Sequence, residues 1–203
     1  MDDDVEIFIA EEYRTMAAFA GPLAGRISRR LHGRPDCFEY DVKTVSDCPG
    51  FIDGMLERLR ESASEVAAAL NRLGGTVDDV AIELVMDDLE HALSEILDSV
   101  DEVKCAELEG AEEAGPLLVA VQQRVVRDVL RVLQTLVDAV NHPERFMDAS
   151  GEDVELDLFL ELDVSAEMAA LETWAERQQQ TRPGFGWGGV LAAFGLGWWL
   201  GRN

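Results

Sequence analysis

The stretch "PLLVAVQQRVVRDVLRVLQTLVDAV", residues 116–140, decides the fold. Its apolar residues recur at steps of three and four, which predicts an α-helix with one wide apolar face. Pro116 suits the first helical position, and Asn141, His142 and Pro143 end the pattern. No other stretch before the C-terminal tail is as apolar, so we expect this helix to be the central, enclosed helix of a helical domain. The apolar stripe is formed by Leu118, Val121, Val125, Val129, Val132, Leu133, Leu136 and Val140.

Three earlier stretches show the same spacing. It predicts helices over residues 9–31, 51–73 and 76–105. The pair Gly21–Pro22 should kink or split the first of them, because proline removes a backbone donor inside a helix. Thr76 is the expected N-cap of the third.

The remaining parts of the domain are less regular. Residues 32–50 predict a loop with at most a short helix or strand, and residues 107–115 an acidic connector. Residues 154–162 alternate apolar and acidic side chains as a strand does, but a lone strand is marginal in water, so we expect a helix there. A last helix should end near residue 180, with Leu171 and Trp174 on its apolar face. We therefore predict an all-α fold, a single bundle of six or seven helices over residues 1–180.

The charge balance limits the partners. Asp and Glu number 41 against 17 Lys and Arg, a formal net charge of -24. Such a surface repels the phosphates of nucleic acids and of anionic lipids, so we expect no nucleic-acid partner. Adaptation to high salt is an alternative reason for the acidity.

The cysteines and histidines indicate no special chemistry. The three cysteines, Cys37, Cys48 and Cys105, are odd in number and widely spaced, which favours free thiols in a reducing, cytosol-facing compartment. The histidines are isolated, so no metal site is expected. Phosphate loops and nucleophile elbows are missing as motifs. We expect a binding protein without cofactors and not an enzyme, although carboxylates from several helices could still converge on a site.

The tail "PGFGWGGVLAAFGLGWWLGRN", residues 183–203, contrasts with this acidic domain. Its first nineteen residues carry no charge and would span about 28 Å as a helix, close to the hydrocarbon thickness of a bilayer. Residues 181–203 are therefore expected to be a transmembrane anchor, with interfacial tryptophans and small residues that allow self-association. Folding of the tail onto the domain, or a role as an oligomerisation peptide, are the alternatives. The anchor candidates are Trp187, Gly189, Ala193, Gly197, Trp198, Trp199, Gly201 and Arg202.

A helical domain with an enclosed helix and a tail ending "GLGWWLGRN" resembles the Bcl-2 family of apoptosis regulators. The Asn-Trp-Gly-Arg signature of cellular members is missing, so the chain is most similar to virus-encoded members of the poxvirus type. The resemblance implies a tail-anchored regulator, expected to be an inhibitor, of host cell death. It would lie at the mitochondrial outer membrane, favoured over the endoplasmic reticulum, and would bind BH3 helices of pro-apoptotic partners in an apolar groove.

The same resemblance suggests which residues would serve these roles. The groove would be built from residues 52–133, with an arginine on the central helix to meet the partner's aspartate. A BH3-like spacing is also present, although Gly75 stands where that motif has an acid. The groove candidates are Val85, Leu89, Leu93, Ile96, Val121, Arg124 and Arg127, and the BH3-like residues are Val66, Leu70, Leu73, Gly74 and Val77.

A second, shorter resemblance lies in "VKCAE", residues 103–107. It is similar to the Leu-x-Cys-x-Glu motif by which viral proteins engage retinoblastoma-type pocket proteins, with Val103 in place of the leucine. Cys105 and Glu107 would then be the other contact residues.

An alternative function needs no family resemblance. The acidic helical domain could be an adaptor or structural membrane protein that recruits a basic partner, while the Gly-rich tail oligomerises in the membrane.

Overall fold

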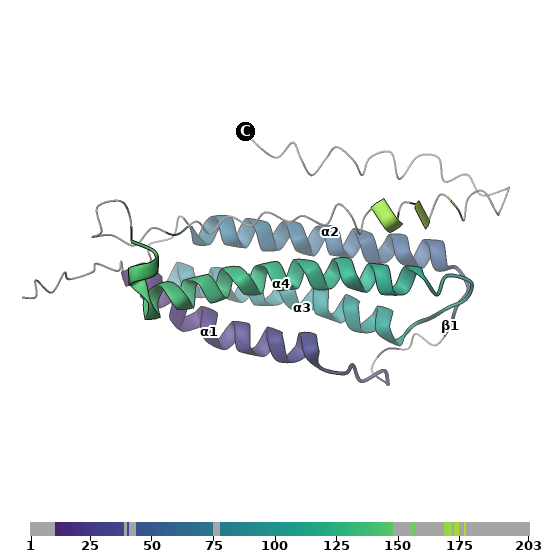
Figure 1. Ribbon diagram of the computed structural model, residues 1–203, viewed down its shortest axis with the longest axis horizontal. Helices are drawn as coiled ribbons and strands as arrows, with labels where there is room; N and C mark the ends of the chain where they lie inside the picture. Colours follow the sequence, from purple (N-terminus) through teal and green to yellow (C-terminus); the bar gives the residue numbers. More distant parts are fainter. Residues whose placement is uncertain are drawn as a thin grey trace, which may run out of the picture.

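The computed structural model describes residues 11–38, 40, 44–74, 78–147, 156, 169–171, 173–174 and 177, and these are mostly helical (Figure 1). This confirms the prediction of an all-α fold. In chain order the elements are α1 (Glu11–His32), β1 (Thr44–Val45), α2 (Cys48–Leu73), α3 (Asp79–Cys105), β2 (Glu107–Leu108), α4 (Ala114–Asn141) and the 3₁₀ helix η1 (Pro143–Arg145). The two short strands pair in parallel, Thr44 with Glu107 and Val45 with Leu108.

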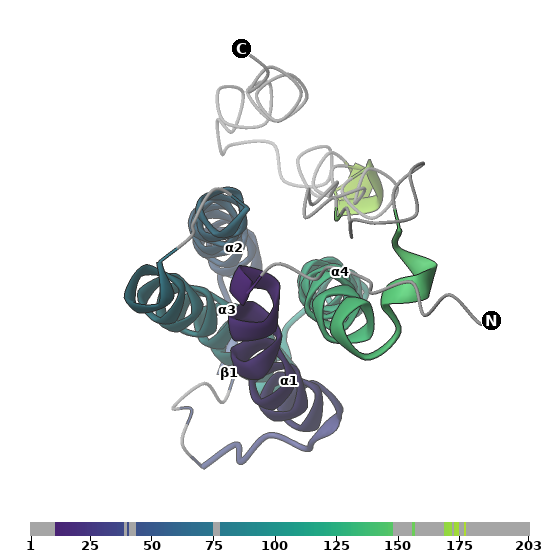
Figure 2. The same cartoon turned by 90° about the vertical axis from the view of Figure 1, so that its left-hand side faces the viewer.

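The four α-helices form a bundle in which successive helices run in opposite directions (Figures 1 and 2). Helix α3 contacts the other three, α2 packs mainly on α3, and α1 packs mainly on α4. Helices α2 and α4 touch each other much less. The order around the bundle is therefore α1, α4, α2 and α3, so the first and last helices are neighbours.

Helix α4 is not the enclosed central helix that we expected. Its apolar face packs on the other helices, but its opposite face carries Arg124, Arg127 and Arg131, which are exposed. In a four-helix bundle each helix is one wall around a shared core, and no helix is surrounded on all sides. The apolar stripe of residues 116–140 correctly predicted which face of the helix is buried. The prediction that other helices surround this helix was wrong.

Pro22 neither splits nor ends α1, which continues to His32. Pro22 and Ala18, the residue whose carbonyl loses its intrahelical donor, both lie on the exposed side, where water can replace the missing bond. Ala20 and Leu23 are buried on the opposite face. Packing of both halves of α1 on the core therefore maintains one continuous helix.

Helix α2 begins three residues before the predicted start. The carboxylate of Asp47 accepts a hydrogen bond from the Gly50 backbone N–H at 3.3 Å, and Pro49 occupies the first turn. A Cβ at position 50 would lie too close to that carboxylate in its present position, so a larger residue there would force the Asp47 side chain to move. The Pro and Gly that suggested a loop in fact form the first turn of the helix.

The other two starts also differ from the prediction. Helix α3 begins at Asp79 after Asp78, so Thr76 is not its N-cap; residues 75–77 lie outside the described part of the chain. Helix α4 begins at Ala114, which makes Pro116 its third residue. Proline is compatible with this position because the first four N–H groups of a helix have no intrahelical acceptor.

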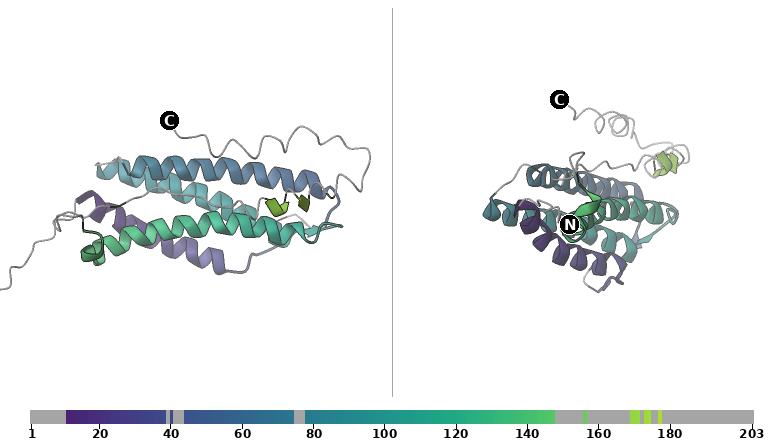
Figure 3. Two further views of the ribbon diagram at one scale, coloured as in Figure 1. Left: turned by 45° about the horizontal axis from the view of Figure 1, so that its top comes forward. Right: turned by 60° about the vertical axis from the view of Figure 1, so that its left-hand side comes forward.

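One apolar core runs through the bundle and includes residues from the C-terminal part of the chain. Leu171 and Trp174 are buried in this core, and the described residues between 169 and 177 are helical, as predicted. They lie alongside α2 and α4, on the side where these two helices separate (Figures 1 and 3). Of residues 154–162 only Leu156 is described, and it packs against the core.

A disulfide bond joins Cys37 to Cys105, so the expectation of three free thiols was wrong. Helices α1 and α3 run in the same direction and touch, which brings the segment after α1 close to the end of α3. The two Cα atoms are 5.4 Å apart, within the range that a disulfide requires. The cysteines therefore no longer indicate a reducing compartment. Cys48 is buried and takes no part in this disulfide.

Candidate functional site

The five apolar groove candidates lie in the interior of the bundle. Val85, Leu89, Leu93 and Ile96 project from α3 and Val121 from α4, and each is at most 5 % exposed. They pack against one another and against the other helices instead of lining an open surface. A groove made of these residues is thus not open in this structure.

The two arginine candidates lie on the outer face of α4. Arg124 donates from Nε to the Asp128 carboxylate at 3.2 Å, and Arg127 donates to the Gln123 side chain at 3.0 Å. Asp128 also accepts from Arg131 at 2.8 Å and is itself only 3 % exposed. Arg124, the groove candidate beside this buried carboxylate, therefore binds a residue of its own helix.

The BH3-like residues that the structure describes are part of the core as well. Val66, Leu70 and Leu73 are buried on the inner face of α2, and Gly74 follows the last residue of that helix. Val77 lies outside the described residues. The spacing corresponds to an amphipathic helix that packs within its own bundle.

The "VKCAE" residues are not presented as a free extended peptide. Val103 is buried, Cys105 ends α3 and is bonded to Cys37, and Glu107 lies exposed in β2. They nevertheless lie beside the pocket described below. All the membrane-anchor candidates, from Trp187 to Arg202, lie outside the described residues. Within the described part, no helix is both long and apolar enough to cross a membrane.

Arginine–carboxylate pairs link the helices. Arg26 grips Glu90 with two hydrogen bonds, from Nε to Oε1 at 2.8 Å and from Nη2 to Oε2. Hydrogen bonding to Glu90 raises the pKa of Arg26 above its ordinary value. Among the described residues, the pairs that join α1 or α2 to α3 are Arg26–Glu90, Arg30–Asp98, Arg30–Asp101, Arg58–Glu102 and Arg72–Asp88.

A polar cluster closes one end of the bundle beside the disulfide. Arg30 bonds Asp98 and lies 3.7 Å from Asp101, Tyr40 donates to Asp98 at 3.3 Å, and Lys104 lies 3.6 Å from Asp101. Burial alone would lower the pKa of Arg30, but the hydrogen bond that Arg30 donates to Asp98 and the charges of Asp98 and Asp101 raise it. Burial raises the pKa of Tyr40, and the same carboxylates raise it further.

Carboxylates elsewhere point to solvent. Glu61 and Glu65 on α2 and Glu83 and Glu95 on α3 are exposed, and no described side chain forms an ion pair or hydrogen bond with them. Four arginines of α1 and α2 are engaged with α3 carboxylates, and the 41 acids of the chain outnumber its 17 bases. The net charge of the chain is therefore carried outward.

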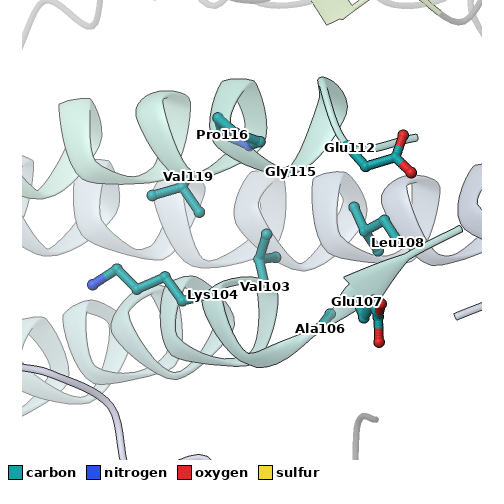
Figure 4. A pocket seen from close by; sticks show the side chains of 9 residues that line it. All are labelled: Val103, Lys104, Ala106, Glu107, Leu108, Glu112, Gly115, Pro116 and Val119. Carbon is teal, nitrogen blue, oxygen red and sulfur yellow. The ribbon is translucent and has the colours of Figure 1, made fainter. Parts of the chain in front are cut away.

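A pocket of about 420 Å³ lies where α3 ends and α4 begins (Figure 4). The side chains of Val103 and Val119 face each other across it, Leu108 lies towards one end, and Glu107 and Glu112 extend from its margin. The lining residues are Val103, Lys104, Ala106, Glu107, Leu108, Glu112, Gly115, Pro116 and Val119. The sequence showed only an acidic connector here. A pocket needs three segments to meet, which residue spacing does not reveal.

Gln122 is a second feature that the sequence interpretation missed. It is fully buried, and neither Nε2 nor Oε1 of its amide has a hydrogen-bond partner. The signal was available, because Gln122 falls among the most buried apolar positions of the 116–140 stripe. A buried amide without partners costs about 1–3 kcal/mol, so this position calls for a test.

The described residues contain no group of three or more His, Cys, Asp or Glu side chains that could hold a metal ion. No protein-family model, curated protein or solved structure matches this chain.

Proposed function

We propose that this protein is an acidic helical adaptor without catalytic activity. Its bundle recruits a basic partner, and residues 183–203 attach it to a lipid bilayer and pair through their glycine faces. The proposal rests on the charge arrangement of the bundle and, for the tail, on the sequence of nineteen uncharged residues.

The observation that carries the proposal is the separation of charges within the bundle. Arg26, Arg30, Arg58 and Arg72 of α1 and α2 bind carboxylates of α3, whereas Glu61, Glu65, Glu83 and Glu95 face solvent. A surface with an excess of negative charge attracts partners of positive charge and accelerates their association. The same negative charge keeps the domain hydrated when it lies close to a membrane.

Recruitment can be tested with the full chain inserted into neutral phosphatidylcholine vesicles. A rhodamine-labelled peptide with four arginines around one serine should float with these vesicles and not with empty ones. Binding should weaken as the salt concentration rises from about 50 to about 300 mM, because salt screens exposed charges. A chain with Glu61, Glu65, Glu83 and Glu95 all changed to Gln should recruit less peptide. Equal recruitment by empty vesicles would reject the proposal.

The membrane role has its own test. Deletion of residues 183–203 should move the protein from the membrane fraction to the soluble fraction. The double substitution Gly197→Leu and Gly201→Leu should retain membrane attachment and abolish self-association, because leucine prevents close approach of two helices. Equal solubility of the full and truncated chains would remove the anchor from the proposal.

Apoptosis regulation by BH3 binding would require a different state of the bundle. The groove candidates Leu89, Leu93 and Ile96 are fully buried, so a BH3 helix would reach them only if helices separated. Labelled BH3 peptides titrated into the full chain distinguish the two functions. Saturable binding tighter than about 10 μM, roughly -7 kcal/mol, would favour the Bcl-2-like function over the adaptor.

A further inference from the structure

We infer that the pocket between α3, β2 and α4 is the docking site for a tryptophan side chain within a basic segment of a partner. This inference rests on the proposed adaptor function and assigns it a specific site. The pocket combines an apolar interior with an acidic margin, and its wall is held in place before any partner arrives.

The interior fits one large apolar side chain. Val103, Leu108, Pro116 and Val119 line a volume of about 420 Å³, and all four belong to helices or to a paired strand. Tryptophan is enriched among the residues that dominate binding energy, because it buries a large rigid surface at a small entropic cost. Its indole N–H would also find carboxylate acceptors at the margin (Figure 4).

The wall formed by residues 106–108 is held by the residues on either side of it. The disulfide fixes Cys105, and the Glu109 N–H donates to the Val45 carbonyl at 3.1 Å. The buried Cys48 thiol donates to the Glu109 carbonyl at 3.3 Å. A surface connector rarely needs so many constraints, and a preformed wall reduces the entropic cost of binding.

Gly115 brings α4 against this wall. A Cβ at that position would lie 3.3 Å from the Leu108 side chain, closer than most such contacts, so a larger residue would displace the Leu108 side chain slightly. The glycine therefore allows α4 and the wall to approach closely at this point.

The charge around the pocket identifies the partner as basic. Glu112 and Glu113 precede α4, where a helix N-terminus already stabilises carboxylates, so they alone say little about a partner. Glu107, which lines the pocket, and Glu109, which directly follows the wall, have no such local reason, and both are exposed. Lys104 is the one cationic side chain among the lining residues, and it lies 3.6 Å from Asp101, with which it forms an ion pair. Guanidinium groups on either side of a docked indole would meet these glutamates.

The test uses the full chain in non-ionic detergent and a rhodamine-labelled peptide of two arginines, one tryptophan and two arginines. The control peptide has serine in place of tryptophan and the same charge. The tryptophan peptide should bind at least about tenfold more tightly by fluorescence anisotropy. Val119→Phe, which fills the pocket, should remove that difference and leave the weak binding of the serine peptide unchanged. Glu107→Gln with Glu109→Gln should weaken both peptides, whereas the equally charged control pair Glu83→Gln with Glu95→Gln should affect the tryptophan peptide less.

A second measurement locates the peptide without altering the pocket. In amide NMR spectra the tryptophan peptide should shift the signals of Leu108 and Gly115, and the serine peptide should not. Equal affinity of the two peptides would overturn the pocket and leave the adaptor function standing. No binding of either peptide would overturn both. An affinity unchanged by Val119→Phe in a variant with a normal helical spectrum would also overturn the pocket.

Discussion

Cys37 and Cys105 are 68 residues apart in the sequence and are joined by a disulfide bond at one end of the bundle. The bond closes a loop that contains β1, α2 and α3, and it stands next to the pocket wall. The bond reduces the conformational entropy of the unfolded chain, because the residues of this loop must remain closed, and it therefore stabilises the folded state.

Reduction of this bond should therefore destabilise the protein. A loop of this length corresponds to about 4 kcal/mol in the chain-entropy model, or about 10 °C in Tm for a chain of this size. The double variant Cys37→Ser, Cys105→Ser should melt at the temperature of the reduced wild type in a thermal scan followed by circular dichroism. Its Tm should not respond to dithiothreitol. A wild type whose Tm ignores dithiothreitol would contradict this prediction.

Gln122→Met should stabilise the protein. Methionine occupies a similar volume and leaves no buried amide without partners, so the free energy of unfolding should rise by about 1–2 kcal/mol and Tm by about 4 °C. Gln134→Met is the matched control, because Gln134 is exposed and donates to Asp138 at 2.9 Å. It should change the free energy of unfolding by less than about 0.5 kcal/mol. A destabilised Gln122→Met protein would mean that a water molecule or a partner satisfies the amide.

Asp128→Asn should destabilise the protein by about 2 kcal/mol in urea unfolding. The substitution removes the charge that Arg124 and Arg131 bind and leaves a buried amide beside two cations. Glu57→Gln removes the same charge from the exposed Glu57–Arg60 pair and should have an effect below about 0.5 kcal/mol. Because the net charge changes equally, the comparison isolates burial. Similar effects of the two substitutions would show that Asp128 is of no special importance.

Asp53 predicts a dependence of stability on pH. Burial raises its pKa above the ordinary 3.8, and the charge of Asp47 raises it further. The folded state therefore holds this proton more tightly than the unfolded chain, so ionisation of Asp53 costs stability as the pH rises above 3.8. Asp53→Asn should raise Tm at pH 7, and the gain should shrink towards pH 3. The exposed Glu61→Gln should show a smaller gain at pH 7, and an equal gain would attribute the effect to net charge alone.

The sequence predicted those features that depend on one face of one helix. The three-and-four spacing located α1 to α4 and the end of α3 at Cys105, because an apolar stripe must be covered wherever it lies. It could not show what covers the stripe. Leu89 and Ile96 face their own bundle, although the same spacing would suit a partner's helix.

The features that the sequence did not predict depend on how separate segments meet in space. The disulfide and the Arg26–Glu90 pair require helices that are far apart in the chain to end or pass at the same level. The pocket requires the end of α3, the strand β2 and the start of α4 to enclose a space between them. The start of α2 was missed for a local reason, since Pro49 and Gly50 are typical of loops and of first helical turns alike. The hydrogen bond between the Asp47 carboxylate and the Gly50 N–H stabilises a first helical turn here instead of a loop.

The order of the helices in the bundle also has a consequence for protein synthesis. Helices α2 and α3 are consecutive and make the most extensive contact, so this hairpin can assemble as soon as residue 105 has left the ribosome. Helix α1 is made first, but its main neighbour is α4. Its apolar face therefore stays without its principal cover until nearly 110 further residues, to Asn141, have been added. During this interval α1 is the part of the nascent chain that most needs protection by a chaperone.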